Sequence, residues 1–113
     1  MNSVELIGRL VYEPEVKKIE SGSSVLSLRI AVPRNDKAKT TDFINCQAWD
    51  KTADFIGKYF HKGDPIDITG RLQNKSYEKQ DGTKVAETFV YIKEAAFVPG
   101  KTNNQSEPED YSI

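Results

Sequence analysis

Residues that could build a covalent or metal-bound scaffold are scarce in this sequence. Cys46 is the only cysteine and His61 the only histidine. A single cysteine excludes an intrachain disulfide and a metal site of the cysteine type. We therefore expect no metal and no cofactor, and the reducing cytoplasm is the simplest location for the chain.

Membrane and secretion signals are also missing. No apolar run reaches the roughly 18 residues of a membrane span, and residues 1–5 lack the basic and apolar regions of a secretion signal. We expect neither insertion into a membrane nor secretion.

A recognisable set of catalytic residues is absent too. An enzyme needs a nucleophile with a base, paired acids in a cleft, a metal cluster or a phosphate-binding loop, and the sequence shows none of these patterns. His61 lies at the end of a predicted helix, where a structural role is favoured. Cys46 lies on the predicted inner face of a strand and is typical of a small core residue. The sequence favours a binding protein over an enzyme.

An excess of positive charge, the usual sign of a nucleic-acid-binding protein, is not found either. The formal net charge is −1. Residues 100–113 contribute −2, because Lys101 is outnumbered by Glu107, Glu109 and Asp110, so residues 1–99 carry only +1. Any contact with nucleic acid must therefore depend on where the basic residues lie. The chain has 113 residues, which fits one domain. We predict a folded domain over residues 1–99 and a short, acidic, disordered tail over residues 100–113.

Hydrophobic patterning predicts strands at 4–11 with 16–19, 25–32, 42–49, 66–77 and 85–98. Between the third and fourth strands a helix is predicted over 50–62, with Asp50 as its N-cap and Gly63 as its C-cap. The helical face consists of Ala53, Ile56, Tyr59 and Phe60. This order is that of an all-β, five-stranded OB barrel whose helix closes one end. A small sandwich or SH3-like barrel fits the strand count but does not explain the position of the helix.

Alternation along strand 42–49 separates two faces, because successive side chains in a strand point in opposite directions. Ile44, Cys46 and Ala48 form an apolar face that we assign to the core. The other face carries Phe43, Asn45, Gln47 and Trp49. In strand 66–77 the predicted inward residues are Ile66, Ile68, Gly70 and Leu72, and the predicted outward residues are Thr69, Arg71, Gln73, Lys75 and Tyr77.

Aromatic rings interleaved with arginine and lysine form a platform on which unpaired bases stack while the cations follow the phosphates. Phe43, Trp49 and Tyr77 are the candidate stacking residues. The alternative is that these rings pack under the helix or in a subunit interface, where aromatic residues of small domains are common. Alternation alone does not decide between the two interpretations, because bulges shift strand parity.

Several segments occur in the order and spacing of a known family. They include Asn2-Ser3-Val4-Glu5-Leu6-Ile7-Gly8-Arg9-Leu10, Asp42-Phe43-Ile44-Asn45-Cys46, Trp49-Asp50-Lys51, Tyr59-Phe60-His61-Lys62-Gly63 and Gly70-Arg71-Leu72. On these segments the sequence resembles the bacterial, or phage-encoded, single-stranded DNA-binding protein family over nearly the whole predicted domain. The resemblance implies an OB fold, a homotetramer wrapped by single-stranded DNA, base stacking at Phe43, Trp49 and Tyr77, and roles in DNA replication, recombination and repair.

The resemblance also implies basic contacts to the DNA backbone. The matching candidates are Arg9, Arg29, Arg34, Arg71 and Lys75, joined by Lys37, Lys39, Lys79 and Lys84 on two predicted loops. Each single lysine fits a solvated surface charge equally well. Arg71 ranks above the loop lysines because it shares the predicted face of Tyr77.

Two regions depart from the family pattern. The loop 34–41 has no aromatic residue, although some relatives carry one there, so a stacking contact is missing. The family's long linker with an aspartate-rich, Pro-Phe tip is replaced by a short segment containing Glu107, Glu109, Asp110, Tyr111 and Ile113. Such a segment fits docking of replication and repair proteins, and it equally fits a plain disordered terminus.

Two other functions fit an OB fold. The first is an assembly subunit of a primosome-type replication-restart complex, for which the fluorescence of Trp49 would not respond to DNA. The second is RNA binding of the cold-shock type, but the aromatic-rich strand motifs of that family are absent.

Overall fold

Six strands and one helix make up the computed structural model, which describes residues 1–100. The elements in chain order are β1 (Val4–Leu10), β2 (Lys17–Lys18), β3 (Ser24–Pro33), β4 (Thr41–Trp49), α1 (Asp50–Tyr59), β5 (Pro65–Glu78) and β6 (Lys84–Ala96). The short β2 is the second piece of the interrupted first strand. Of the residues 100–113 assigned to a disordered tail, 101–113 lie outside the described residues.

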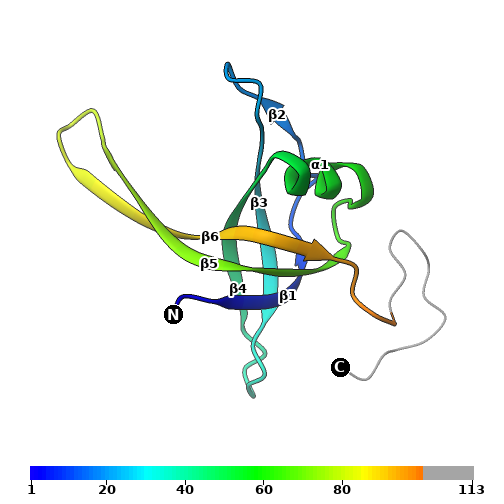
Figure 1. Ribbon diagram of the computed structural model, residues 1–113. Coiled ribbons are helices and arrows are strands. Elements are labelled where there is room, and N and C mark those ends of the chain that lie inside the picture. Colours follow the sequence, from blue (N-terminus) through cyan, green and yellow to red (C-terminus); the bar gives the residue numbers. More distant parts are fainter. Residues whose placement is uncertain (101–113) are drawn as a thin grey trace.

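The strands close on themselves (Figure 1). They follow the order β1-β5-β6-β4-β3-β2, and a further antiparallel pairing of β1 with β3 closes the sheet. All pairs are antiparallel except β4 with β6, which run parallel. A closed sheet with one helix between the third long strand and the next confirms the predicted OB fold.

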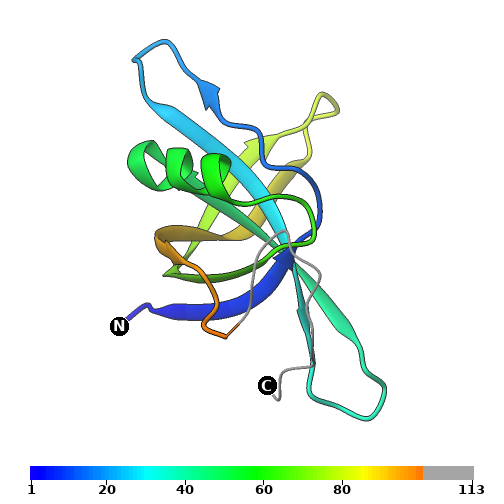
Figure 2. The same ribbon diagram turned by 90° about the vertical axis from the view of Figure 1, so that its right-hand side faces the viewer.

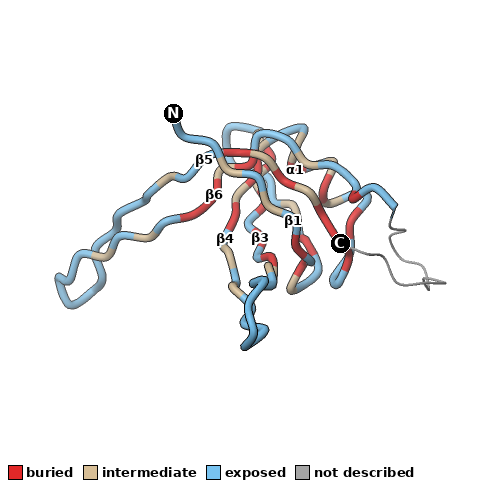
Figure 3. Tube along the Cα trace, turned by 90° about the horizontal axis from the view of Figure 1, so that it is seen from below, coloured by how far each residue is buried: buried red, intermediate tan, exposed pale blue. Residues whose placement is uncertain are grey.

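The core occupies the inside of this barrel and the contact with α1. It consists of alternating residues of the strands together with Ala53 and Ile56 from α1 and Phe60 immediately after it. Burying each large apolar side chain contributes roughly 1.5–3 kcal/mol relative to leaving it in water. Figure 3 shows the buried residues concentrated where the strands cross, with the projecting parts exposed.

The hairpin formed by β5 with β6 and the hairpin formed by β3 with β4 extend beyond the barrel (Figures 1 and 2). The β5–β6 ribbon pairs continuously from Asp67 opposite Ala96 to Glu78 opposite Lys84, with one register shift between Thr69 and Gly70. Most β5 side chains beyond Gly70 are exposed, although Val90 of β6, which lies opposite Leu72, still belongs to the core.

Leu72 shows the consequence. We predicted that it points into the core, but its side chain is 49% exposed. Its backbone is instead paired with the side chain of Asn2, whose amide nitrogen donates to the Leu72 carbonyl (2.8 Å) and whose oxygen accepts from the Leu72 N–H (2.9 Å). Leu72 lies on the same side of β5 as Ile68 and opposite the buried Val90, so the predicted parity holds, but the ribbon leaves the barrel at this point. That departure is not visible in the alternation of one strand.

The helix differs from its prediction at both ends. Its N-cap is Trp49, and the Asp50 carboxylate accepts a hydrogen bond from the Ser24 N–H (3.2 Å) instead of capping the helix. The helix ends at Tyr59, three residues before the predicted Lys62, and Tyr59 is exposed although it was assigned to the buried face.

The early helix end has a physical cause in the turn that follows. The Asp64 carboxylate accepts from the His61 N–H (2.8 Å), and Gly63, at a φ of 88°, donates its N–H to the Leu10 carbonyl (2.9 Å). These bonds hold residues 61–64 against the end of β1. A left-handed φ favours glycine, so Gly63 serves this turn and not the helix terminus.

Glu13 fastens the segment after β1 to the same turn. Its carboxylate accepts from the Lys62 N–H (3.0 Å) and lies 2.8 Å from Nδ1 of His61. The backbone hydrogen bond from Lys62, followed by the hydrogen bond with His61, lowers the pKa of Glu13.

We expect Glu13→Gln to reduce the free energy of unfolding at neutral pH. A carboxylate with a lowered folded-state pKa stabilises the fold above its unfolded pKa, about 4.3, and loses that contribution as the pH falls through the folded value. Denaturant midpoints of both proteins between neutral and acidic pH should therefore converge below about pH 4.3. A difference that is constant over the whole range would contradict this role of Glu13.

Candidate nucleic-acid interface

The outer face of β4 presents the two aromatic rings expected there. Ile44, Cys46 and Ala48 turn inward, and Phe43 on the opposite side is 52% exposed. Trp49 is half-buried, and its indole Nε1 donates to Oε1 of Gln47 (3.1 Å). This bond satisfies the only polar atom of the indole and fixes the ring against the strand.

Cross-strand register joins this face to those of three other strands, because residues opposite one another point to the same side of a sheet. Phe43 lies opposite Ala31, Gln47 opposite Tyr91, and Tyr91 opposite Arg71. The resulting surface, called here the aromatic face, comprises Phe43, Trp49, Tyr77, Phe89 and Tyr91 with Arg29, Arg71 and Lys75.

Cations lie over three of its rings. The guanidinium carbon of Arg29 is 5.4 Å from the centroid of Phe43, and that of Arg71 is 4.9 Å from the centroid of Tyr91. Nζ of Lys75 is 5.9 Å from the centroid of Phe89. Attraction between a cation and the negative face of a ring holds each pair together, so positive charge and aromatic surface alternate along this face.

A hydrogen bond from its hydroxyl fixes the position of the Tyr77 ring. The ring is 44% exposed, and the hydroxyl donates to Oε1 of Glu87 (3.0 Å) on the neighbouring strand. This hydrogen bond, together with desolvation and the negative charge of Glu87, raises the pKa of Tyr77. The phenol therefore stays neutral at physiological pH, and its orientation is fixed at the edge of the aromatic face.

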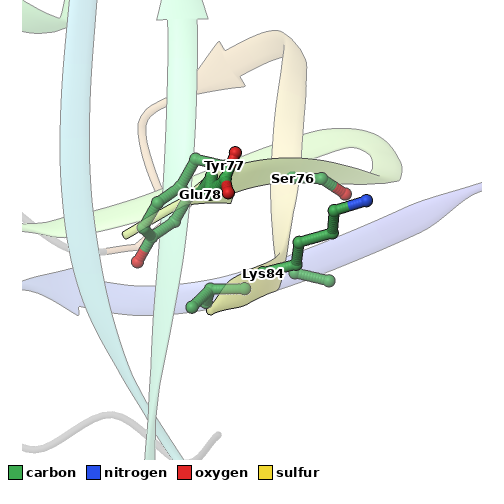
Figure 4. A pocket seen from close by; sticks show the side chains of 6 residues that line it. Ser76, Tyr77, Glu78 and Lys84 are labelled. Atoms are coloured by element: carbon green, nitrogen blue, oxygen red, sulfur yellow. The ribbon is translucent and has the colours of Figure 1, made fainter. Parts of the chain in front are cut away.

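A hollow borders Tyr77 on the ribbon and is lined by Ser76, Tyr77, Glu78, Lys84, Val85 and Ala86. Lys84 pairs with Glu78, whereas Tyr77 pairs with Val85, so the side chains of Lys84 and Tyr77 belong to opposite faces of the ribbon. Figure 4 shows the Lys84 side chain extending away from the Tyr77 ring. The structure thus separates this predicted DNA contact from the nearest predicted stacking residue.

Arg9 and Arg34 line one groove beside β1, together with the apolar Ile7, Pro33 and Pro65. Arg9 donates to the Gly63 carbonyl (2.9 Å). Arg34 forms a two-pronged ion pair with Asp42, with Nε 3.0 Å and the terminal nitrogen 2.9 Å from the carboxylate oxygens, and this hydrogen-bonded pairing lowers the pKa of Asp42. Arg34 is therefore already paired with a carboxylate in this structure.

The remaining predicted contacts lie on the two hairpin loops. Lys37 and Lys39 lie between β3 and β4, and Lys79 lies in the turn between β5 and β6. None of these lysines is among the cations that lie over a ring of the aromatic face. The predicted partner-binding residues Glu107, Glu109, Asp110, Tyr111 and Ile113 lie outside the described residues.

Sequence reasoning missed Phe89 and Tyr91 on this surface. Strand 85–98 has apolar residues at both parities, since Val90 and Ile92 alternate with Phe89 and Tyr91, and this pattern does not reveal which set faces outward. Only the pairing of Gln47 with Tyr91 places the ring beside β4. Phe89 is only 9% exposed, so it is largely covered.

Catalytic and metal chemistry have little support in the part of the chain that the structure describes. Within residues 1–100, no group of three or more histidine, cysteine or acidic side chains is arranged to hold a metal ion. Burial raises the pKa of the Cys46 thiol to about 12, which leaves it protonated and unreactive. No helix in the described range is long and apolar enough to cross a membrane.

Comparisons with known proteins all point to one family. The model of the Single-strand binding protein family matches residues 1–98. A single-stranded DNA-binding protein of Fusobacterium nucleatum is 44% identical over 110 residues, covering 92% of this chain and 71% of the relative. Single-stranded DNA-binding protein B of Bacillus subtilis is 32% identical over 109 residues, covering 93% and 96%. These matches do not favour the primosome-type assembly subunit. The chain therefore belongs to the single-strand binding protein family.

Proposed function

We propose that this protein binds single-stranded DNA without catalysis and with little sequence preference, by laying unpaired bases against the aromatic face. The observation that carries the proposal is the alternation of aromatic rings and cations across β3, β4, β5 and β6 in a chain of this family. Every base has a π-face, so stacking on such a surface does not depend on base identity. Bound in this way, the protein would coat and protect unpaired DNA during replication, recombination and repair.

Phe43, Trp49 and Tyr77 are the proposed stacking residues. Phe43 and Tyr77 are exposed on this surface and Trp49 is half-buried, so all three rings are accessible to a base. Each stacked base contributes about 1–3 kcal/mol. Glu87 orients Tyr77 but also brings a negative charge close to the proposed DNA path. The aromatic face thus combines favourable stacking with a local electrostatic cost.

Phosphate contacts are assigned first to Arg29, Arg71 and Lys75, whose charged groups already lie on the aromatic face. Arg9 and Arg34 extend the proposed path along the groove beside β1. To bind a phosphate, the Arg34 guanidinium would either leave Asp42 or contact the phosphate and Asp42 together. Lys37, Lys39, Lys79 and Lys84 are assigned to peripheral contacts, since they lie on the hairpins.

Assembly and partners form the second part of the proposal. By its family membership we infer a homotetramer around which DNA wraps, located with the DNA in the cytoplasm. Residues 107–113 carry acids next to Tyr111 and Ile113, a combination suited to basic, apolar docking sites on replication and repair proteins. Light scattering of the purified protein measures the subunit number, and a monomer would contradict the inferred assembly.

Salt dependence tests the electrostatic part. We expect the affinity for oligo-dT to fall with salt, at a log-log slope of about −0.7 for each phosphate neutralised. Arg71→Gln should make the slope shallower by about 0.7 if Arg71 contacts one phosphate. Lys58→Gln on α1 is the matched control and should leave the slope unchanged. Titrations at a series of salt concentrations measure it, and a salt-independent affinity would contradict the proposal.

A further inference from the structure

Tyr91 occupies the middle of the aromatic face. It lies on β6, which runs between β4 and β5 (Figure 1), opposite Gln47 on one side and Arg71 on the other. We propose that Tyr91 is an additional base-stacking position, which connects Trp49 on β4 to Tyr77 on β5. This inference rests on the proposed function and adds a residue to the same surface.

The spacing of the other rings supports this assignment. Trp49 is two residues from Gln47, the partner of Tyr91, so the two rings are neighbours on adjacent strands. Tyr77, by contrast, is six residues along β5 from Arg71, which at about 3.3 Å per residue is about 20 Å. A DNA strand passing between Trp49 and Tyr77 therefore crosses β6, where Tyr91 provides a half-buried ring and Phe89 is largely covered.

The contact between Arg71 and the Tyr91 ring indicates how a base would reach that ring. Its guanidinium carbon lies 4.9 Å from the Tyr91 centroid, and its Nε donates to Oε1 of Gln73 at 3.3 Å, a long hydrogen bond. The planar guanidinium thus covers the surface that an incoming base would occupy. Stacking of a base on an aromatic ring is stronger than an exposed cation–ring contact. A base therefore displaces Arg71 from the ring, and the released guanidinium pairs with the adjacent phosphate.

The test compares Tyr91→Leu with Tyr91→Phe in full-length protein. Leucine keeps an apolar side chain but removes the ring, whereas phenylalanine keeps the ring and removes only the hydroxyl. Tyr59→Leu is the matched control, because Tyr59 is a solvent-accessible tyrosine with a cation beside its ring, Nζ of Lys58 being 5.2 Å from the centroid, but it lies on α1. Quenching of Trp49 by dT oligomers gives the dissociation constants, and denaturant midpoints report folding.

We expect Tyr91→Leu to raise the dissociation constant about tenfold, with Tyr91→Phe and Tyr59→Leu close to wild type. Wild-type affinity in Tyr91→Leu, with Trp49 still quenched, overturns the role of Tyr91 and leaves the proposed function intact. Absence of quenching in the wild-type protein overturns the proposed function itself.

A second measurement does not depend on the folding of a variant. Wild-type protein is irradiated with an oligonucleotide that carries photoreactive iodouracil in place of thymine, and the cross-linked peptides are sequenced. We expect cross-links at Tyr91 as well as at Trp49. Cross-links at Phe43, Trp49 and Tyr77 with none at Tyr91 would overturn the inference.

Discussion

Replacing Trp49 with alanine is expected to weaken the binding of oligo-dT by about 1–3 kcal/mol, and replacing Tyr77 with alanine should have an effect of the same size. Each change removes a ring on which one base stacks. Because Trp49→Ala also removes the fluorophore, binding is measured by the anisotropy of a labelled oligonucleotide. Tyr59→Ala, on the exposed side of α1, is the control and should bind like the wild type.

Neither alanine substitution should unfold the domain. Tyr77 lies on the part of the β5–β6 ribbon that leaves the barrel, and Trp49 lies outside the core formed by Cys46 and Ala48. A loss of affinity therefore reports a lost contact, provided that denaturant midpoints confirm folding. If both variants bind at wild-type strength, the assignment of these rings to bases is wrong.

Gly70→Ala is expected to have the largest effect on stability, a loss of about 3 kcal/mol in the free energy of unfolding. A Cβ at this position would overlap the backbone carbonyl oxygen of Tyr91, and its carbonyl carbon would lie 2.9 Å away. Backbone atoms held in a strand ladder cannot rotate aside as a side chain can. The overlap would therefore force β5 away from β6.

The matched control is Gly82→Ala in the β5–β6 turn. Gly82 has a φ of 88° but no atom within 4 Å of an added Cβ, so only backbone strain of about 1 kcal/mol is expected. Urea or guanidinium unfolding of both variants measures the difference. Equal midpoints for Gly70→Ala and Gly82→Ala would show that β5 and β6 do not approach as closely as the structure indicates.

Gly70 also affects the geometry of the aromatic face. It immediately precedes Arg71, and the register shift between Thr69 and Gly70 sets which residues of the ribbon lie opposite Tyr91. Close contact of the two backbones at Gly70 thus brings the Arg71 guanidinium over the Tyr91 ring. The same glycine serves the stability of the barrel and the geometry of the candidate site.

Much of the fold was predictable because local sequence patterns determine where the strands begin, end and turn their apolar faces. The period of two in residues 42–49 correctly separated the core residues Ile44, Cys46 and Ala48 from Phe43 and Trp49. The interruption at Glu13-Pro14 correctly divided the first strand, since proline cannot donate a ladder hydrogen bond. These features depend on neighbouring residues, which the sequence displays directly.

Other features depend on contacts between distant residues and could not be read in this way. The helix ends at Tyr59 because Asp64 and Leu10 hold the next turn, and Leu72 is exposed because the β5–β6 ribbon leaves the barrel there. The place of Tyr91 depends on the parallel pairing of β6 with β4. Alternation within β6 alone could not reveal it.

The most direct test of the account is a titration of wild-type protein with oligo-dT while the fluorescence of Trp49, the only tryptophan, is recorded. The account predicts saturable quenching, because a base stacks on the indole ring. Emission that stays unchanged at every oligonucleotide concentration would contradict the aromatic face as a DNA-binding surface, and would favour a protein-interaction role for the same fold.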